Sequence, residues 1–250
     1  MNMDLRQGDC LEIMKEIPSK SIDLILCDLP YGTTICKWDV IIPFDKLWEQ
    51  YNRIIKDNCA IVLTASQPFT TKLINSNIKN FKYCWVWEKS RNSNPSLCKH
   101  QPLRYTEDIV IFNAKRVYNP IMEKGKSYKT SKGAGGRFAG NKVNKKELLI
   151  KINHGRYPKN IIRIKSEYPN SIVHPTQKPI KLMEYLIKTY SNENDLVLDN
   201  CMGSGTTGVA CKNLERNFIG IELDEKYFNI AKKRIESSEK QETLRGNFKA

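Results

Sequence analysis

Residues 28–31 of the chain, Asp28-Leu29-Pro30-Tyr31, place a carboxylate, a backbone carbonyl next to a proline, and an aromatic ring in succession. They follow residues 22–27, an apolar run with the length of a buried strand. The Asp28 carboxylate and the Leu29 carbonyl can each accept one N–H, and the ring of Tyr31 can stack on a flat molecule. The group therefore suits a planar molecule that carries an exocyclic amine. Since Asp and Pro are common turn residues, the same four residues also fit a strand that ends in an ordinary turn.

A second group of polar and glycine residues follows another apolar segment nearer the end of the chain. The predicted strand 195–199 ends on Asp199, and a glycine-rich turn opens a helix directly after it. Glu222 follows the next strand, 217–221, near the spacing at which a nucleotide-binding sheet places a ribose-binding carboxylate. The glycines of the turn are Gly203, Gly205 and Gly208. Their spacing also fits a dinucleotide fingerprint, which leaves a nicotinamide or flavin cofactor open, but the turn lacks the Gly-Lys-Ser/Thr of a phosphate loop.

Two further positions could contact a ligand at the start of a helix. His174-Pro175-Thr176-Gln177-Lys178-Pro179 precedes a predicted helix over 180–190, and the helix N-terminus and Lys178 could receive an anion such as a carboxylate. Asp9 lies where a predicted strand over 3–6 turns into a helix. Both positions have simpler interpretations, because His-Pro-Thr is common in turns and Asp9 fits a helix N-cap.

The elements that must position these residues alternate between strand and helix. Runs of strand character cover 3–6, 22–27, 60–64, 81–88, 107–113, 195–199 and 217–221, and helical patterns cover 11–17, 44–56, 67–77, 180–190 and 224–236. This alternation predicts an α/β fold with a doubly wound, mostly parallel sheet. In such sheets ligands bind at the carboxyl ends of the strands, which is where Asp28 would lie.

The segment from Ala114 to Lys165 differs in composition from the rest of the chain. It contains fifteen Lys or Arg residues against two acids, Glu123 and Glu147, so it carries nearly all of the net charge of +14. Aromatic residues lie among the basic ones, which indicates a nucleic-acid-binding insertion in which Lys and Arg contact phosphates. A disordered basic linker is the alternative. The candidates for DNA contact are Lys126, Lys129, Lys132, Arg137, Lys142 and Lys145.

Length, charge and cysteine content limit the classes of protein to which this chain can belong. The chain has 250 residues, 40% of them apolar, and a pI of about 9.3, which allows one large domain with an insertion and favours a polyanionic partner. None of the eight cysteines is paired in C-x-x-C spacing and no His cluster accompanies them, so we expect no metal site and no disulfide framework. The N-terminal residues lack a signal peptide and no apolar run reaches transmembrane length, so we expect a cytoplasmic protein without a membrane partner.

Taken together, Asp28–Tyr31, His174–Pro179 and Asp199–Gly205 resemble the motifs of the S-adenosylmethionine-dependent DNA amino-methyltransferases, which modify adenine N6 or cytosine N4. Their order along the chain is similar to the β-class, a circular permutation with the catalytic tetrapeptide first and the cofactor turn last. The resemblance spans about the whole chain. It implies a seven-stranded methyltransferase sheet whose antiparallel strand is 109–112. It also implies a catalytic half over 1–113, a target-recognition insertion over 114–170 and a cofactor-binding half over 171–250.

The resemblance also implies roles for individual residues. Asp28, Leu29, Pro30 and Tyr31 would form the catalytic tetrapeptide, although the family's second residue is usually proline. The cofactor-binding residues would be Asp9, Thr176, Lys178, Asp199, Met202, Gly203, Gly205, Thr206 and Glu222. Within this set, Asp199 and the turn would hold the methionine part, Glu222 the ribose, Asp9 the adenine, and the loop 174–179 the methionine carboxylate. Cys201 stands where the family commonly has phenylalanine.

These roles imply direct methyl transfer to the amine of a base that has been flipped out of double-stranded DNA. None of the cysteines follows a proline, as the nucleophile of a ring-carbon methyltransferase would. Adenine is favoured, since Asp at the first tetrapeptide position is associated with adenine in the family, and cytosine N4 is the alternative. The residues also leave open an RNA or protein-amide methyltransferase, a nicotinamide-dependent oxidoreductase and a non-catalytic DNA-binding protein. The family contains monomers and homodimers, some with a cognate restriction endonuclease.

Overall fold

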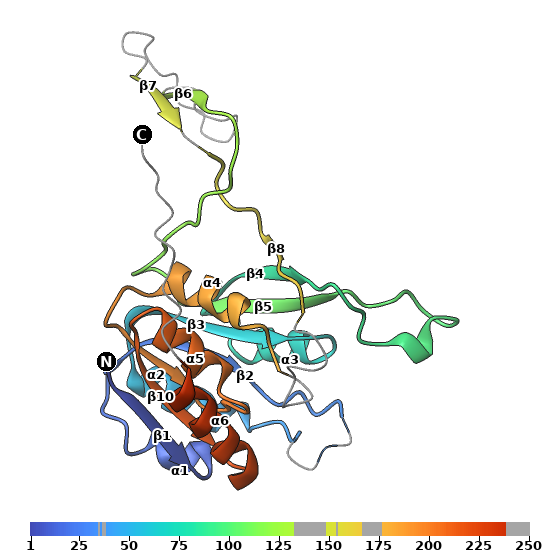
Figure 1. The fold of residues 1–250 in the computed structure, drawn as a ribbon, viewed down its shortest axis with the longest axis vertical. Helices are drawn as coiled ribbons and strands as arrows, with labels where there is room; N and C mark the ends of the chain where they lie inside the picture. The colour runs from blue at the N-terminus through green and yellow to red at the C-terminus, as the bar shows by residue number, and fades with distance from the viewer. Residues whose placement is uncertain (35, 37–38, 133–148, 154, 167–176, 239–250) are drawn as a thin grey trace. The chain divides into compact units, whose positions relative to one another are not determined.

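The computed structural model describes residues 1–250 except 35, 37–38, 133–148, 154, 167–176 and 239–250 (Figure 1). These residues form two compact units. The first comprises Met1–Asn119 and Asn160–Ala250, and the second comprises Pro120–Lys159. Among the described residues, none of the helices is both long enough and apolar enough to cross a membrane.

One sheet organises the first unit, and its described strands run in the order β1-β10-β9-β2-β3-β5-β4-β8. The bounds are β1 (Met3–Gln7), β10 (Asn217–Glu222), β9 (Leu196–Asp199), β2 (Ile22–Asp28), β3 (Ile55–Ala65), β5 (Thr106–Phe112), β4 (Phe81–Glu88) and β8 (Ile161–Arg163). Only β5 runs antiparallel to its neighbours, β3 and β4; the other strand pairs are parallel. The predicted doubly wound fold and its antiparallel strand at 109–112 are thus confirmed.

The strand count differs from the predicted seven, because β8 adds an eighth strand beside β4. β8 is three residues long, too short for an alternating pattern to be visible in the sequence. Its central residue, Ile162, is buried with Trp85 and Trp87, and the indole N–H of Trp87 donates to the Ile164 carbonyl at 2.8 Å. Burial of Ile162 against these two indoles accounts for the extra strand.

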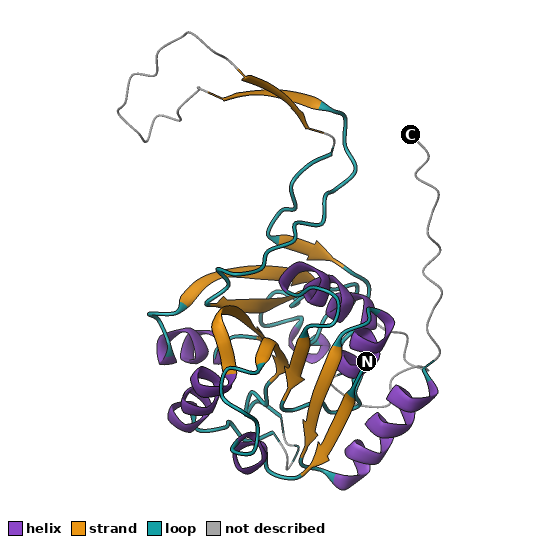
Figure 2. Cartoon of the chain, turned by 90° about the vertical axis from the view of Figure 1, so that its left-hand side faces the viewer, coloured by secondary structure: helices purple, strands orange, loops and turns teal. Residues whose placement is uncertain are grey.

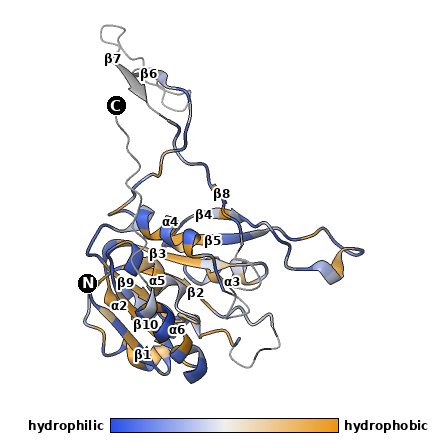
Figure 3. Ribbon diagram, viewed as in Figure 1, coloured by the Kyte–Doolittle hydropathy of each residue, from blue (hydrophilic) through white to orange (hydrophobic). Residues whose placement is uncertain are grey.

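Helices cover both faces of this sheet (Figures 1 and 2). The helices α1 (Cys10–Met14), α2 (Phe44–Ile54) and α3 (Phe69–Ser76) share one apolar cluster with Ile25 and Cys27 of β2. The helices α4 (Ile180–Tyr190), α5 (Thr206–Asn213) and α6 (Glu225–Ser237) share the opposite cluster with Leu24 and Leu26. Alternate residues of β2 therefore point to opposite faces, and since both faces are buried the strand reads as a continuous apolar run. In Figure 3, β3 is orange while α4 alternates between blue and orange.

The second unit contains an antiparallel pair, β6 (Tyr128–Lys132) and β7 (Leu149–Asn153). An isolated bridge joins Glu123 to Arg156, and the Arg156 guanidinium lies 4.3 Å from the centre of the Tyr128 ring. The predicted insertion thus contains regular structure at its described positions. A short 3₁₀ helix, η1 (Pro95–Leu97), lies in the first unit between β4 and β5.

Candidate active site

A cavity of about 750 Å³ opens at the carboxyl ends of the central strands. It is lined by residues that follow β1, β2, β4, β9 and β10 and by Glu107 near the start of the antiparallel β5. Ligands bind at this edge of doubly wound sheets, where strand order reverses. We name two parts of the cavity by their residues: the tetrapeptide arm (28–31, Lys89, Glu107 and Lys178) and the glycine-turn arm (199–204 and Glu222).

Asp28 ends β2 and is the centre of the tetrapeptide arm. The Tyr31 hydroxyl donates to Asp28 Oδ1 at 2.7 Å and also lies 3.1 Å from Thr64 Oγ1. The Thr64 hydroxyl donates to the same carboxylate oxygen. The Tyr31 ring stacks on Phe69, with centroids 5.0 Å apart, and burial raises the pKa of its phenol. The structure therefore brings the predicted carboxylate and ring together.

The two middle residues of the tetrapeptide, Leu29 and Pro30, lie between the core and the cavity. Leu29 is buried in the cluster shared by α1, α2 and α3, and Pro30 follows it at the cavity wall. Leucine therefore occupies the usual proline position by packing its side chain into the core, which leaves its carbonyl as the group available for hydrogen bonding in the cavity.

Lys178 lies in the tetrapeptide arm, where its buried ammonium contacts two carboxylates. The Lys178 Nζ atom is 2.7 Å from Asp28 Oδ2 and 3.4 Å from Glu107 Oε2, while Lys89 Nζ is 2.8 Å from Glu107 Oε1. Burial alone lowers the pKa of an ammonium, but Asp28 and Glu107 outweigh it and raise the pKa of Lys178. The two ammonium groups likewise lower the pKa of Glu107 against the effect of its burial. The sequence predicted a cofactor carboxylate as the partner of Lys178; the described partners are carboxylates of this chain.

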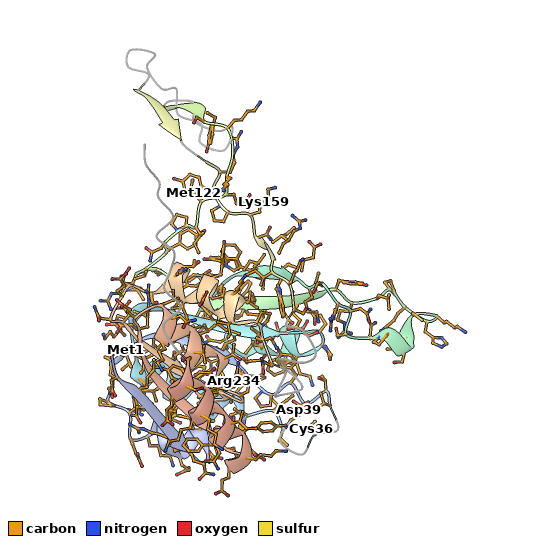
Figure 4. The ribbon with its side chains drawn as sticks, in the orientation of Figure 1. Met1, Cys36, Asp39, Met122, Lys159 and Arg234 are labelled. Atoms are coloured by element: carbon orange, nitrogen blue, oxygen red, sulfur yellow. The ribbon has the colours of Figure 1, made fainter. Side chains whose placement is uncertain are left out.

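The loop after the tetrapeptide is held by Asp39, a residue that the sequence motifs do not mark (labelled in Figure 4). Its carboxylate accepts backbone N–H groups from Gly32, Thr33 and Thr34 at 2.8, 2.9 and 2.6 Å. Burial would raise the pKa of Asp39, but these hydrogen bonds lower it overall. Asp39 thus fixes the backbone directly after Tyr31 through three hydrogen bonds. These bonds help to hold Tyr31 beside Asp28.

Asp199 is the buried acid of the glycine-turn arm. It accepts the Cys201 N–H at 3.1 Å and the Thr207 hydroxyl at 2.6 Å. Burial raises the pKa of Asp199 to about 6, and the hydrogen bonds offset only part of that effect. Asp199 therefore carries a negative charge at neutral pH in a place that disfavours it.

Glu222 ends β10 and supports the turn. Its carboxylate accepts the Gly203 N–H at 2.8 Å and the Asp224 N–H at 2.9 Å, and burial raises its pKa. Among the described residues, neither Asp199 nor Glu222 takes part in an ion pair. This arm is thus acidic and lacks a counterion from the described part of the chain.

Two of the turn's predicted glycines have a left-handed backbone. Gly205 has φ of 79°, and a side-chain carbon there would lie 2.9 Å from Ala231 Cβ on α6. Gly203 has φ of 51° and lines the cavity. Glycine is needed at 205 because that backbone is left-handed and touches α6.

The other predicted residues of this arm reach the cavity from helix and strand ends. Met202 is buried, and its sulfur packs against Gly220 of β10. Thr206 begins α5 at the cavity wall. Asp9 is the N-cap of α1, where its carboxylate accepts the N–H groups of Leu11 and Glu12, and it also lines the cavity. A role as helix cap and a role in ligand contact are therefore compatible for this residue.

Four of the predicted residues lie outside the described residues: Thr176, Arg137, Lys142 and Lys145. Lys129 and Lys132 belong to β6, and Lys126 lies exposed just before that strand. Their assignment to DNA contact stays a prediction.

Comparison with known proteins assigns the chain to a family. A family model described as DNA methylase, of the N6/N4 methyltransferase type, matches residues 22–233. The chain belongs to the N6/N4 DNA methylase family. The resemblance inferred from the sequence is therefore confirmed.

Individual members of the family are similar over nearly the whole chain. The type II methyltransferase M2.LlaDCHI of Lactococcus lactis subsp. cremoris is 44% identical over 268 residues, covering 94% of this chain and 89% of that protein. The type II methyltransferase M2.MboI of Moraxella bovis is 28% identical, covering 93% and 87%.

Solved structures show the same arrangement. The crystal structure of an M1.HpyAVI–SAM complex matches with a TM-score of 0.63 and 29% identity, over 93% of this chain and 98% of that one. The cytosine-N4-specific PvuII DNA methyltransferase matches with a TM-score of 0.66, over 94% and 86%, but at 17% identity it shows the fold alone.

Proposed function

We propose that this chain transfers the methyl group of S-adenosylmethionine to the N6 amine of adenine in double-stranded DNA. One observation carries the proposal: a single cavity joins Asp28 and Tyr31, which suit a planar amine, to Asp199 and Glu222, which suit a cationic ligand. Family membership supports DNA methylation in general.

The glycine-turn arm fits this cofactor better than a dinucleotide. S-adenosylmethionine carries an ammonium and a sulfonium, and when bound it supplies an electrophilic methyl group. Asp199 and Glu222 provide negative charge with no ion-pair partner among the described residues, which favours a cation and disfavours the pyrophosphate of a nicotinamide or flavin dinucleotide. In this proposal Asp199 and the turn 202–205 hold the methionine part, Glu222 holds the ribose, and Asp9 faces the adenine.

The tetrapeptide arm positions the base amine. Flipping a base out of the duplex costs a few kcal/mol, and stacking on Tyr31 offsets roughly 1–3 kcal/mol of that cost. Asp28 and the Leu29 carbonyl accept the two N–H groups and thereby aim the nitrogen lone pair. The amine nitrogen held by Asp28 and Leu29 would gain the N–C bond, with S-adenosylhomocysteine as the leaving group, and one amine proton would pass to water. The acceleration comes from orientation and electrostatics rather than from a covalent enzyme nucleophile.

The segment 114–165, which carries most of the net positive charge, is proposed to bind the DNA. The charge of 114–165 suits the DNA backbone, and we propose that Lys126, Lys129 and Lys132 near β6 contact phosphates. The similar type II methyltransferases support a role in restriction and modification. A cognate endonuclease as partner and a place in the cytoplasm are further parts of the proposal.

The test is a labelled-methyl transfer assay on mixed-sequence duplex DNA, followed by digestion to nucleosides and mass spectrometry. The expected product is N6-methyldeoxyadenosine, with D28A as the inactive control. If the product is N4-methyldeoxycytidine, methyl transfer to a DNA amine is confirmed, but the target base is cytosine instead of adenine. Transfer to RNA alone, or none to DNA while the cofactor binds, would contradict the proposal.

A further inference from the structure

We propose that Lys178 is a positioning residue: its ammonium holds Oδ2 of Asp28, so that Oδ1 is the oxygen that accepts the amine of the target base. This inference rests on the proposed function and deepens it. It gives Lys178 a place in the methyl-transfer step instead of a place on the cofactor carboxylate.

The two oxygens of Asp28 have different kinds of partner. Oδ2 contacts the buried ammonium of Lys178 at 2.7 Å. Oδ1 accepts from two neutral hydroxyls, those of Tyr31 and Thr64. Removing an ammonium from a half-buried carboxylate leaves unpaired charge, which costs more than exchanging one neutral donor for another. Oδ1 is therefore the exchangeable oxygen.

Tyr31 is the donor that has to exchange. Its hydroxyl occupies Oδ1 while its ring stacks on Phe69. A ring that stacks on an incoming base must turn, and the turn releases Oδ1 to the base amine. During this exchange the carboxylate needs a fixed partner on its other oxygen, and Lys178 is that partner.

Lys178 itself is held from two directions. Its side chain is 8% exposed, and Nζ also lies 3.4 Å from Glu107, which in turn pairs with Lys89 at 2.8 Å. Its backbone precedes Pro179, the N-cap of α4, whose inner face is buried in the core. The start of α4 and the ion pair with Glu107 therefore hold the Lys178 ammonium in place. A side chain that positions Asp28 needs to be held in this way.

The charged and titratable groups that face Asp28 come from several elements. They are Tyr31 on the following loop, Cys27 on β2, Glu107 on β5, Asp199 on β9 and Lys178 before α4. Among the described residues, Lys178 is the cation in direct contact with Asp28, so its loss leaves Oδ2 without a charged partner. The carboxylate is then no longer held in one orientation, and the methyl-transfer rate at saturating cofactor should fall.

The experiment measures single-turnover methyl transfer to DNA at saturating cofactor, with the affinities for cofactor and DNA measured separately. The variants are K178M, which has a similar length but no charge, K178R, which keeps the charge, and K188M, an exposed matched control on α4. For K178M we expect a rate about 30–100-fold lower. Affinities for S-adenosylmethionine and DNA should change less than about threefold, because the described partners of Lys178 are Asp28 and Glu107 of this chain. K178R should recover most of the rate, and K188M should match the wild type.

Two results would overturn the inference. One is a K178M rate at saturating cofactor equal to that of the wild type. The other is a loss of cofactor affinity with normal turnover at saturation, which would assign Lys178 to the cofactor. If K178M shows no cooperative melting, K178Q is measured in its place, with the same fall in rate and the same unchanged affinities expected. Failure of the wild type to methylate DNA would instead refute the proposed function itself.

Discussion

The two arms of the cavity stabilise their acidic side chains in different ways. In the tetrapeptide arm, Asp28 and Glu107 are paired with Lys178 and Lys89 of the same chain. In the glycine-turn arm, Asp199 is met by backbone and hydroxyl donors, and its pKa rises to about 6. One arm is neutralised internally and the other is left acidic.

This difference matches the kind of group that each arm would receive in the proposed function. A neutral base amine brings no charge, so the carboxylate that aims it has to be stabilised beforehand by the protein. A cationic cofactor brings its own charge, so an internal counterion would compete with it. The uncompensated acid lowers the stability of the free protein and gains its partner on binding, a trade-off that is common at functional sites.

The largest effect is expected for removal of the carboxylate that aims the amine. D28A should lower the single-turnover rate by about 10²–10³-fold, because the lone pair is no longer oriented, while cofactor affinity stays near wild type. Titration calorimetry with S-adenosylmethionine checks the second part. A near-wild-type rate with normal DNA binding would contradict the assignment of Asp28.

The second variant, D199N, tests how much the ionised Asp199 lowers the free energy of unfolding. The pKa of Asp199 rises from 3.8 to about 6, so folding disfavours its ionised form. That cost is fully present above pH 6 and disappears below pH 3.8, because both states are then protonated. D199N should therefore raise the unfolding free energy at pH 8 by about 1–3 kcal/mol, with no gain near pH 3.5. Denaturant titration of both chains measures it, and a less stable D199N at pH 8 would refute the argument.

A smaller effect is expected for the acid that ends β10. E222Q should weaken S-adenosylmethionine binding by about tenfold, the equivalent of 1.4 kcal/mol, since the amide keeps one acceptor but loses the charge. Turnover at saturating cofactor should stay unchanged. Equal losses in affinity and turnover would place Glu222 in the methyl-transfer step instead.

The smallest effect is expected for the Tyr31 hydroxyl. Y31F keeps the ring that stacks on the base and removes only a donor that the amine displaces from Asp28, so the rate should stay within about threefold of wild type. Y31A should lose about tenfold or more, since stacking is lost with the ring. A large loss in Y31F measured by single turnover would show that the hydroxyl acts in the reaction.

The sequence predicted the acids of both arms better than their partners. Asp28, Asp199 and Glu222 each end a buried apolar run, and that local signal alone places them at one edge of a parallel sheet. Lys178 meets Asp28 across 150 positions of sequence and approaches Glu107 from a different element, so no local pattern marks the pair. Asp39 is a similar case, because its loop has no periodicity from which the hydrogen bonds to Gly32–Thr34 could be inferred.

The difference between the arms is tested most directly by calorimetric titration of S-adenosylmethionine into the wild type and D199N from pH 5 to pH 8. At pH 8 the wild type should bind more tightly by about ten- to a hundredfold, because ionised Asp199 meets a cation. As the pH falls through 6, Asp199 becomes protonated and the ratio of the two affinities should approach one. A ratio that stays constant across this range, or equal affinities at pH 8, would contradict the account.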